Sequence, residues 1–466
     1  MTDRWREECG VFGIALRRGD AAPFVYTGLL ALQHRGQESA GMATYDGANL
    51  HVHKGMGLVS EVFRMGPTGM PGSVGVGHVR YSTMGSAVPA NAQPVVVPSR
   101  WGPVAVAHNG NLTNAPQLRA ELEARGMVFR TTSDTEVIAL SIAAARVDSV
   151  EEAIRATMVR LEGAFTVTAL AGGSLFAFRD RYGIRPLVLG RLEEGWVVAS
   201  ETCALDSVGA VYVRDVHPGE MVAVGRDGVR AEQVLPGGRP ASCVFEFIYF
   251  ARPDTVLLGR TVHEVRRRMG RVLAQEHPAD ADVVIPVPDS GTSAALGYAE
   301  QSGLPFELGL VKNRYVGRTF IEPDPARRAF GVQAKLSAVR AVVAGRRVVL
   351  VDDSIVRGTT SARIVRTLRE AGAREVHLRI SSPPIRWPCF YGVDTSSRGQ
   401  LVAARLDVEG IRREIGAESL GYLSQEGLVT AIGLPGQVLC MACLDGRYPT
   451  PTPTESEAGK YALERR

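Results

Sequence analysis

Short apolar runs that end in polar, glycine-containing segments recur in the second half of the chain. Residues 348–351 are four apolar side chains, three of them β-branched, and residues 282–287 form a similar run. Runs of this length indicate buried strands of a parallel sheet rather than helices. Farther along, apolar residues recur at helical spacing over 364–371, until Gly372 ends the segment. The order of strand, polar loop and helix predicts an α/β domain.

The first half of the chain has a different pattern, with strand-like runs between Gly, Asp and Pro turns and two longer segments of helical character. These features predict strands at 174–178, 187–189, 196–199 and 220–224, covered by helices at 135–146 and 150–161. Between the two patterns, residues 236–240 are Pro-Gly-Gly-Arg-Pro, which is typical of a linker. We therefore expect a first domain over 9–235 and a second over 241–448, joined by 236–240.

Composition and charge narrow the classes of function. The chain has 466 residues, 45% of them hydrophobic, a net charge of +4 and six cysteines. This length supports two cores, and the small, scattered charge argues against nucleic acid or a membrane surface as a partner. No apolar run approaches the roughly 18 residues of a membrane span, and residues 1–8 do not form a secretory signal. We expect a cytoplasmic protein with reduced cysteines and a polar, disordered tail over 449–466.

The strand at 348–351 leads into a loop that suits a sugar phosphate. It ends on Asp352 and Asp353, and residues 354–361 then supply a glycine and several hydroxyl groups. Ligands of open α/β sheets bind beyond the carboxyl ends of the strands, and N–H groups at a helix N-terminus bind phosphate. Two carboxylates beside a phosphate need a cation or ribose hydroxyls between them. An Asp-Asp pair alone would be no more than a helix cap, but the whole stretch predicts a site for ribose phosphate and magnesium.

Two further segments could complete this site. Ser290 lies in a second hydroxyl-rich loop, after the other predicted strand, and could ligate magnesium. Residues 312–320 carry three cations, Lys312, Arg314 and Arg318. These cations could form a solvated surface, but near Asp352 a flexible basic loop that closes over pyrophosphate fits better.

A candidate nucleophile lies near the start of the chain. Cys9 follows eight largely hydrophilic residues and precedes an apolar, alternating segment. If residues 1–8 were removed, the α-amine of Cys9, with an ordinary pKa of about 7.7 to 8.0, could act as the base for its own thiol. A lone cysteine is more often a small buried side chain, and His34 or His78 could supply a base instead. Other segments must decide between these interpretations.

Four polar, glycine-containing segments in the first half are typical of loops that bind an amino acid. Arg80 suits a carboxylate, Asp134 suits an ammonium group, and Asn109 with the amide of Gly110 suits a developing oxyanion. The fourth segment surrounds Arg35. Any one of these residues alone would more often be structural, so the inference depends on their occurring together.

With Cys9, these segments resemble the class II, N-terminal-nucleophile glutamine amidotransferase domain over about 9–235. The resemblance implies a four-layer αββα sandwich in which glutamine is hydrolysed through a thioester to release ammonia, and a leader, 1–8, that is removed. Carried over by motif, the nucleophile would be Cys9, the oxyanion hole Asn109 and Gly110, and the glutamine clamps Arg80 and Asp134, with Arg35 helping to close the pocket.

The loop that starts at Asp352 resembles the phosphoribosyl pyrophosphate loop of type I phosphoribosyltransferases, an α/β fold with a mostly parallel sheet. In that family the loop holds the ribose phosphate and the acidic pair faces the ribose hydroxyls. By this resemblance, the ligand would be bound by Ser354, Arg357, Gly358, Thr359 and Thr360 and by Lys312, Arg314 and Arg318, and magnesium by Ser290, Asp352 and Asp353.

Because both resemblances occur in one chain, the chain as a whole resembles a family of two-domain enzymes. These enzymes transfer the amide nitrogen of glutamine to C1 of phosphoribosyl pyrophosphate. This resemblance implies that the products are phosphoribosylamine, glutamate and pyrophosphate, in the first committed step of purine synthesis. It also implies purine nucleotides as feedback inhibitors and a homo-oligomer, with four subunits in the family. The likeness covers nearly the whole chain except residues 1–8 and the tail.

Four cysteines could share a site. Cys440 and Cys443 form a C-x-x-C, whereas Cys243 and Cys389 lie far upstream. A thioredoxin-like motif would follow an early strand, zinc sites usually use two close pairs, and iron–sulfur clusters accept dispersed thiolates. The residues leave zinc and iron–sulfur open. The resemblance to the cluster-bearing branch of the family implies a [4Fe–4S] cluster on these four and leaves Cys203 as a core residue.

Two other classes of function remain open. A nucleotide-sensing regulator can keep a phosphoribosyl pyrophosphate loop without catalysis, but it would have no use for Cys9 and the glutamine clamps. Another class II amidotransferase could share the first half of the chain. However, an asparagine synthetase would need an ATP pyrophosphatase loop, which this sequence lacks, and a hexosamine-forming enzyme would lack the loop at Asp352.

Overall fold

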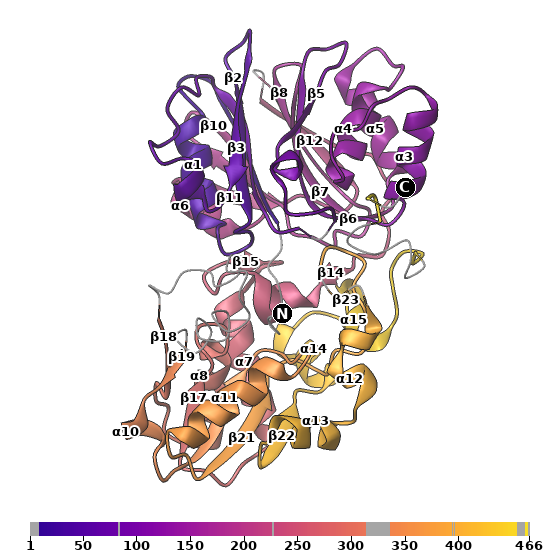
Figure 1. Cartoon of the computed structure of the whole chain (residues 1–466). Helices are drawn as coiled ribbons and strands as arrows, with labels where there is room; N and C mark the ends of the chain where they lie inside the picture. The colour runs from indigo at the N-terminus through magenta and orange to yellow at the C-terminus, as the bar shows by residue number, and fades with distance from the viewer. Residues whose placement is uncertain are drawn as a thin grey trace.

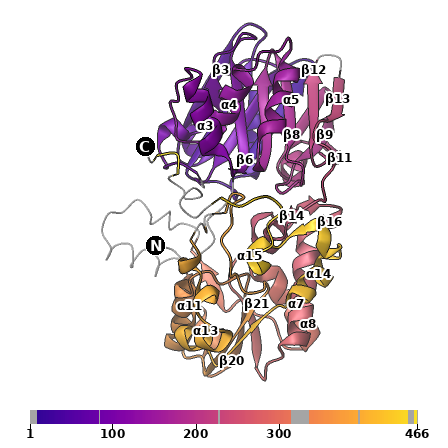
Figure 2. The same ribbon diagram turned by 90° about the vertical axis from the view of Figure 1, so that its right-hand side faces the viewer.

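The computed structural model describes residues 9–82, 84–225, 228–313, 336–393, 395, 397–453 and 462–464. Figure 1 shows an upper lobe formed by the first half of the chain and a lower lobe formed by the second half. Between them, residues 236–240 contain no helix or strand. Near its end the chain returns to the upper lobe, where residues 462–464 lie (Figure 2).

Two antiparallel sheets pack face to face in the upper lobe. The first has the strand order β11-β9-β10-β1-β4-β2-β3 and the second the order β13-β12-β8-β7-β6-β5. Small and branched side chains such as Val11, Ala107 and Leu175 fill the space between them. The strands of the first sheet are β1 (Gly10–Leu16), β2 (Ser39–Tyr45), β3 (Leu50–Met56), β4 (Val74–Arg80), β9 (Val188–Leu192), β10 (Gly195–Ala199) and β11 (Val211–Asp215); those of the second are β5 (Val95–Val97), β6 (Val104–Leu112), β7 (Gly163–Ala171), β8 (Ser174–Arg179), β12 (Glu220–Gly225) and β13 (Gly228–Gln233).

Helices cover the outer face of each sheet, and each layer of helices forms an apolar core with its sheet. The helices over the first sheet are α1 (Ala22–Ala31), α2 (Val59–Val62) and α6 (Thr202–Ser207); those over the second are α3 (Ala115–Ala124), α4 (Asp134–Ala143) and α5 (Val150–Arg160), with the 3₁₀ turn η1 (Pro89–Asn91) in a connecting loop. These layers confirm the predicted αββα sandwich.

A four-stranded parallel sheet, in the order β17-β20-β21-β22, forms the centre of the lower lobe. Both faces of the sheet are covered, which explains the uninterrupted apolar run in β20. Val349 and Val351 pack in a core shared with α7 and α8, whereas Val348 and Leu350 pack in a core shared with α11 and α13. The bounds are β17 (Val283–Pro286), β20 (Arg347–Asp352), β21 (Glu375–Ile380), β22 (Ser419–Tyr422), α7 (Val262–Glu276), α8 (Thr292–Ser302), α11 (Thr359–Glu370) and α13 (Val408–Ile415).

Shorter elements connect the lobes and close the lower one. Among the described residues no helix has the length and apolar character needed to cross a membrane. The remaining elements are β14 (Ser242–Cys243), a π-helix (Glu246–Phe250), β15 (Val256–Leu257), β16 (Arg260–Thr261), β18 (Leu310–Lys312), β19 (Leu336–Ala338), α10 (Arg340–Val343), η4 (Arg398–Gln400), α12 (Val402–Arg405), α14 (Gln425–Ile432), η5 (Gly436–Val438), β23 (Leu439–Cys440) and α15 (Ala442–Asp445).

The tail expected to be disordered from 449 onward makes specific contacts at both of its described ends. Thr450 is buried, and its Oγ1 lies 2.9 Å from the hydroxyl oxygen of Tyr391. Leu463 is only 7% exposed. The polar composition of the tail does not indicate these two contacts. Residues 449–453 and 462–464 are therefore ordered, contrary to the expectation of a disordered tail.

Candidate active sites

Cys9 lies immediately before β1, at the edge of the upper lobe that faces the lower one. Its thiol donates a hydrogen bond to the carbonyl of Tyr81 at 3.3 Å, and its own carbonyl accepts one from Arg35 Nε at 3.0 Å. Gly10 pairs with Val79 of β4, so Cys9 lies beside the end of that strand. The pairing of two buried strands therefore fixes the position of the thiol.

Arg80 is the last residue of β4, and its side chain is 2% exposed. Its guanidinium donates to the carbonyls of Met84 (2.9 Å) and Ser86 (3.3 Å). Burial lowers the pKa of Arg80, while the nearby Cys9 and two carboxylates oppose this shift. A buried guanidinium held by a loop beside the thiol can bind a substrate carboxylate.

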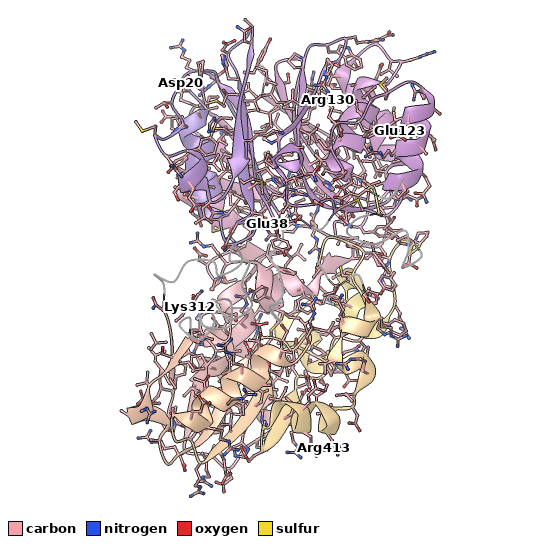
Figure 3. All side chains as sticks on the ribbon, viewed as in Figure 1. Asp20, Glu38, Glu123, Arg130, Lys312 and Arg413 are labelled. Atoms are coloured by element: carbon pink, nitrogen blue, oxygen red, sulfur yellow. The ribbon has the colours of Figure 1, made fainter. Side chains whose placement is uncertain are left out.

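One of those carboxylates, Glu38, lies at the lower edge of the upper lobe in Figure 3. It accepts a hydrogen bond from the backbone N–H of Ser82 at 2.8 Å and another from the Ser82 hydroxyl at 2.5 Å. Gly36 lies on the same stretch, where an added Cβ would lie 2.6 Å from the backbone nitrogen of Arg80. This close approach explains why a glycine follows Arg35.

Asn109 and Gly110 lie on β6, which belongs to the second sheet of the sandwich. Asn109 is 1% exposed, and in the described part of the chain its Nδ2 has no hydrogen-bond partner. Gly110 has φ +137°, and an added Cβ would lie 2.1 Å from the carbonyl oxygen of Ala164. A buried amide donor without an acceptor beside a conformationally special glycine is what an oxyanion hole requires.

Asp134 is the first residue of α4 and is 4% exposed. Its Oδ2 accepts a hydrogen bond from the N–H of Leu112 at 3.0 Å, and its Oδ1 lies 3.6 Å from His108 Nδ1. Both partners lie on β6, the strand that carries Asn109. The structure thus places Cys9 and Arg80 at the paired ends of β1 and β4, and the Asp134 carboxylate against β6, which carries Asn109 and Gly110.

Neither histidine considered as an alternative base suits the role. His78 is fully buried, and burial lowers its pKa to about 3. His34 uses both ring nitrogens, with Nδ1 3.1 Å from the carbonyl of Ala31 and Nε2 2.8 Å from Glu201 Oε1. The geometry therefore favours the α-amine of Cys9.

Arg35 belongs to a buried charge network that the sequence analysis missed. Its Nη1 lies 2.5 Å from Glu201 Oε1, and its Nη2 lies 2.8 Å from Glu246 Oε1. Arg185 Nη1 lies 3.6 Å from the same oxygen of Glu246. Glu246 begins the π-helix that follows the linker, so the network crosses between the lobes. A lone Glu in the apolar stretch 243–251 was the signal that could have revealed it.

Asp352 and Asp353 lie at the carboxyl end of β20 and are each 6% exposed. The backbone N–H of Asp353 donates to Asp352 Oδ1 at 3.0 Å, and Ser354 Oγ donates to Asp353 Oδ1. Gly358, with φ +88°, precedes α11 and offers no side chain to cap it. N–H groups at a helix N-terminus of this kind can bind a phosphate.

The loop of Ser290 lies directly against β20. Val287 donates its N–H to the carbonyl of Val351 at 2.8 Å, and an added Cβ on Gly291 would lie 2.4 Å from the same oxygen. Lys312, labelled on the lower lobe in Figure 3, has its Nζ 3.1 Å from Asp289 Oδ2. The predicted ligand residues Arg314 and Arg318 lie outside the described residues.

Arg266 links the acidic end of β20 to the π-helix. It is 3% exposed and donates to the carbonyls of Phe247 (2.8 Å) and Ala251 (2.9 Å). Burial lowers the pKa of Arg266 to about 10, opposed by the charge of Asp353. No sequence pattern points to this residue, because an arginine on an amphipathic helix is usually at the surface.

The four cysteines proposed to share a site line one cavity, together with Arg185, Tyr391 and Tyr448. β14 pairs with β23 so that Cys243 lies opposite Cys440. Burial raises the pKa of Cys440 to about 12 and that of Cys443 well above its usual value. Among the described residues, no group of three or more His, Cys, Asp or Glu is arranged to hold a single metal ion. The cavity therefore brings together the four cysteines that were expected to share a site.

The fold and the two sites define a class of enzyme: a glutamine amidotransferase of the N-terminal-nucleophile type joined to a phosphoribosyltransferase. A family model described as a glutamine amidotransferase domain matches residues 78–207. The chain is 50% identical over 470 residues to the amidophosphoribosyltransferase of Synechocystis sp., covering 99% of this chain and 95% of that protein, and 51% identical over 452 residues to that of Bacillus subtilis, covering 95% and 94%. The chain belongs to the amidophosphoribosyltransferase family.

Solved structures agree with this assignment. The structure of glutamine phosphoribosylpyrophosphate amidotransferase from B. subtilis in complex with ADP and GMP is 49% identical, with a TM-score of 0.91, and covers 96% of this chain and 98% of that chain. A second structure, described as the allosteric regulatory enzyme of purine biosynthesis, is 48% identical, with a TM-score of 0.92, and covers 98% and 99%. The chain is therefore a glycosyltransferase with a glutamine amidotransferase domain.

Proposed function

We propose that this enzyme hydrolyses glutamine at Cys9 and transfers the released ammonia to C1 of phosphoribosyl pyrophosphate, giving phosphoribosylamine, glutamate and pyrophosphate. The observation that carries the proposal is the buried Asn109 amide, which has no acceptor among the described residues and lies on the strand whose Leu112 N–H donates to Asp134. A non-catalytic regulator would have no need for this arrangement. The reaction would be the first committed step of purine synthesis.

In the glutamine half-reaction, the α-amine of mature Cys9 accepts the thiol proton and the thiolate attacks the amide carbon of glutamine. Asn109 Nδ2 and the N–H of Gly110 stabilise the oxyanion that forms. Arg80 binds the α-carboxylate of glutamine, and Asp134 binds its α-ammonium group. The protonated amine then gives its proton to the leaving ammonia, which leaves a thioester that water hydrolyses to glutamate.

Removal of residues 1–8 is part of this proposal, because an acylated amine cannot accept the thiol proton. Intact-mass measurement of active enzyme tests it. We expect a chain that begins at Cys9, and full glutamine-dependent turnover by a species that retains Met1 would contradict it.

In the transfer half-reaction, the N-terminus of α11 and the side chains of Ser354, Arg357, Thr359 and Thr360 bind the ribose phosphate, and Asp352 and Asp353 face the ribose hydroxyls. Magnesium fits the oxygen-rich donor set of Ser290 and the two aspartates, and when bound it would neutralise the pyrophosphate that leaves. Lys312 adds positive charge near Asp289, on the loop before α8. Ammonia must reach C1 without entering bulk water, where protonation would end its nucleophilicity.

A [4Fe–4S] cluster on Cys243, Cys389, Cys440 and Cys443 fits the shared cavity and the buried thiols. When bound, it would join the start, middle and end of the second half of the chain. Iron and acid-labile sulfide assays on anaerobically purified enzyme test this proposal, with Cys440→Ser expected to lose iron and folded yield. Stoichiometric zinc without sulfide would overturn it.

Regulation and assembly follow from the relatives. ADP and GMP are named in the solved structure of the B. subtilis enzyme, which supports purine nucleotides as feedback inhibitors here. We also propose a homo-oligomer, with four subunits as the first case to test by light scattering, and a cytoplasmic location, which suits the reduced cysteines.

The decisive experiment measures pyrophosphate release. We expect release to require phosphoribosyl pyrophosphate together with glutamine or ammonia, and to stop when either the nitrogen source or the phosphoribosyl donor is omitted. Glutamine hydrolysis without pyrophosphate release at any concentration of donor would point to another class II amidotransferase. The absence of both would support a regulator.

A further inference from the structure

The C-terminal residues 462–464 lie against the glutamine half of the molecule, far along the chain from any residue of that site. Figures 1 and 2 both show this yellow end beside α3 of the upper lobe. Leu463 is 7% exposed and belongs to the same apolar core as Met84 and Leu118. An apolar anchor of this kind holds the segment on the sandwich although the segment follows the second domain in sequence.

Glu464 connects this anchor to two loops at once. Its Oε1 accepts a hydrogen bond from the backbone N–H of Ser86 at 2.7 Å and another from Thr132 Oγ1 at 3.1 Å. Asn91 joins the same two loops, because its Nδ2 donates to the carbonyl of Ser86 and to Thr132 Oγ1, both at 2.9 Å. Glu464 therefore adds a second, charged bridge to a connection that Asn91 already makes.

The two bridged loops are the ones that carry the proposed glutamine clamps. The carbonyls of Met84 and Ser86 accept the hydrogen bonds of the Arg80 guanidinium. Thr132 comes two residues before Asp134, and Ser133 between them caps α4, which begins at Asp134. The spacing between the two loops therefore sets the spacing between the cation and the carboxylate that would bind the two charged ends of an amino acid.

We propose that residues 462–464 are a C-terminal clip and that Leu463 and Glu464 are positioning residues for glutamine. The clip acts by holding the Arg80 loop against the Asp134 loop. This inference rests on the proposed function, since it assigns Arg80 and Asp134 to glutamine. The clip also gives the end of the chain a role in the first half-reaction rather than in the second.

The test compares three purified enzymes with the wild type: a chain that ends at residue 453, Glu464→Gln, and Glu414→Gln as a matched control. Glu414 is exposed on α13, away from the clip. Each protein is assayed with glutamine and, in the same preparation, with ammonium salt. The ammonia reaction reports whether the protein is folded and whether its transfer site works.

We expect Glu464→Gln to raise the KM for glutamine about tenfold, because a hydrogen bond to a charged acceptor becomes a weaker neutral one. The truncated chain should show a larger rise, since it loses Leu463 as well. The kcat at saturating glutamine and the ammonia-dependent rate should stay within twofold of the wild type, as should every parameter of Glu414→Gln. A synthetic peptide of residues 454–466 should lower the KM of the truncated enzyme, and the same peptide with Gln at position 464 should be less effective.

Two outcomes would overturn the clip. One is an unchanged glutamine KM in both variants, and the other is a parallel loss of glutamine- and ammonia-dependent rates, which would mean that the segment only stabilises the fold. Failure of the proposed function would look different, because the wild type itself would then release no pyrophosphate with glutamine. If the truncated chain fails to fold, the glutamine KM of Glu464→Gln, set against its ammonia-dependent rate, still decides.

Discussion

The glutamine site and the phosphoribosyl site are built in opposite ways. The first is held by paired strands of two sheets, and its Arg80, Asn109 and Asp134 side chains are all less than 5% exposed. The second lies on loops beyond strand ends, where Asp353 contacts its neighbour Ser354 and the pair of Lys312 and Asp289 is exposed. A site that forms a covalent intermediate gains from a fixed geometry, whereas a site that admits a large, highly charged ligand gains from open loops.

The strongest way to sharpen this comparison is to remove the charge at the open site. Replacing Asp352 and Asp353 with Asn should lower synthesis from glutamine and from ammonia by about 10³-fold or more, because the ribose and magnesium contacts serve both reactions. Pyrophosphate release with each nitrogen source measures the effect. Asp206→Asn, an exposed change on α6, is the control. Retained synthesis from ammonia would show that the acidic pair is not part of the transfer site.

Removing the nucleophile should separate the two sites. The glutamine-dependent rate of mature Cys9→Ala should be lower by at least about 10⁴-fold, because no thioester can form. The variant should still make phosphoribosylamine from concentrated ammonium salt at alkaline pH. Cys203→Ala, another buried cysteine, should keep both activities. If Cys9→Ala abolished the ammonia reaction in a folded protein, the division of labour between the halves would be wrong.

A smaller effect tests how far the glutamine site is preformed. Asn109→Ala should lower the kcat with glutamine by about 10² to 10³-fold, the range for one oxyanion donor, and leave the ammonia reaction unchanged. Steady-state kinetics with both nitrogen sources check this. A rise in KM at constant kcat would instead assign Asn109 to substrate binding.

The smallest effect concerns the buried ion pairs that Glu201 makes with His34 and Arg35 in the first half of the chain. Burial raises the pKa of Glu201, but His34 and Arg35 outweigh burial and hold the pKa well below its usual value. A carboxyl whose folded pKa is depressed contributes stability above its unfolded pKa of about 4.3, and this stability is lost as the pH falls through the folded pKa. The free energy of unfolding of wild type and Glu201→Gln can be measured with urea from pH 7 to pH 3. It should therefore fall less steeply with decreasing pH in the variant. Parallel curves would contradict the assignment.

The sequence predicted the two folds well because both depend on local patterns. The run at 348–351 appears within β20, and the helix expected after the phosphate loop appears as α11. Three candidate residues of the glutamine site lie at the boundary of an element, with Cys9 before β1, Arg80 at the end of β4 and Asp134 at the start of α4. The roles given to these residues, and to the four cysteines, stay predictions until the variants are measured.

What the sequence could not supply were contacts between distant segments. Glu246 and Arg185 pair across the lobes, and Glu464 reaches loops more than 300 residues earlier in the chain, at Thr132 and Ser86. The spacing of hydrophobic residues and the residue types at turns do not reveal such pairs. The local sequence around a charged residue is the same whether or not that residue has a distant partner. Only the folded structure reveals them.

The pairing of Arg35 and Arg185 with Glu246 also limits how this gene can be rearranged. Separating the halves at the linker would take Glu246 away from Arg185 and would leave Arg35 with Glu201 but without Glu246. Removing one partner of a buried ion pair costs about 3 to 5 kcal/mol. We therefore expect neither half to be a stable protein when it is produced alone, although each has its own sheet and core. Each catalytic unit has its own fold, but the buried charges of one unit are paired with those of the other. Recombination at this linker would therefore be selected against even though the boundary is clear in the sequence.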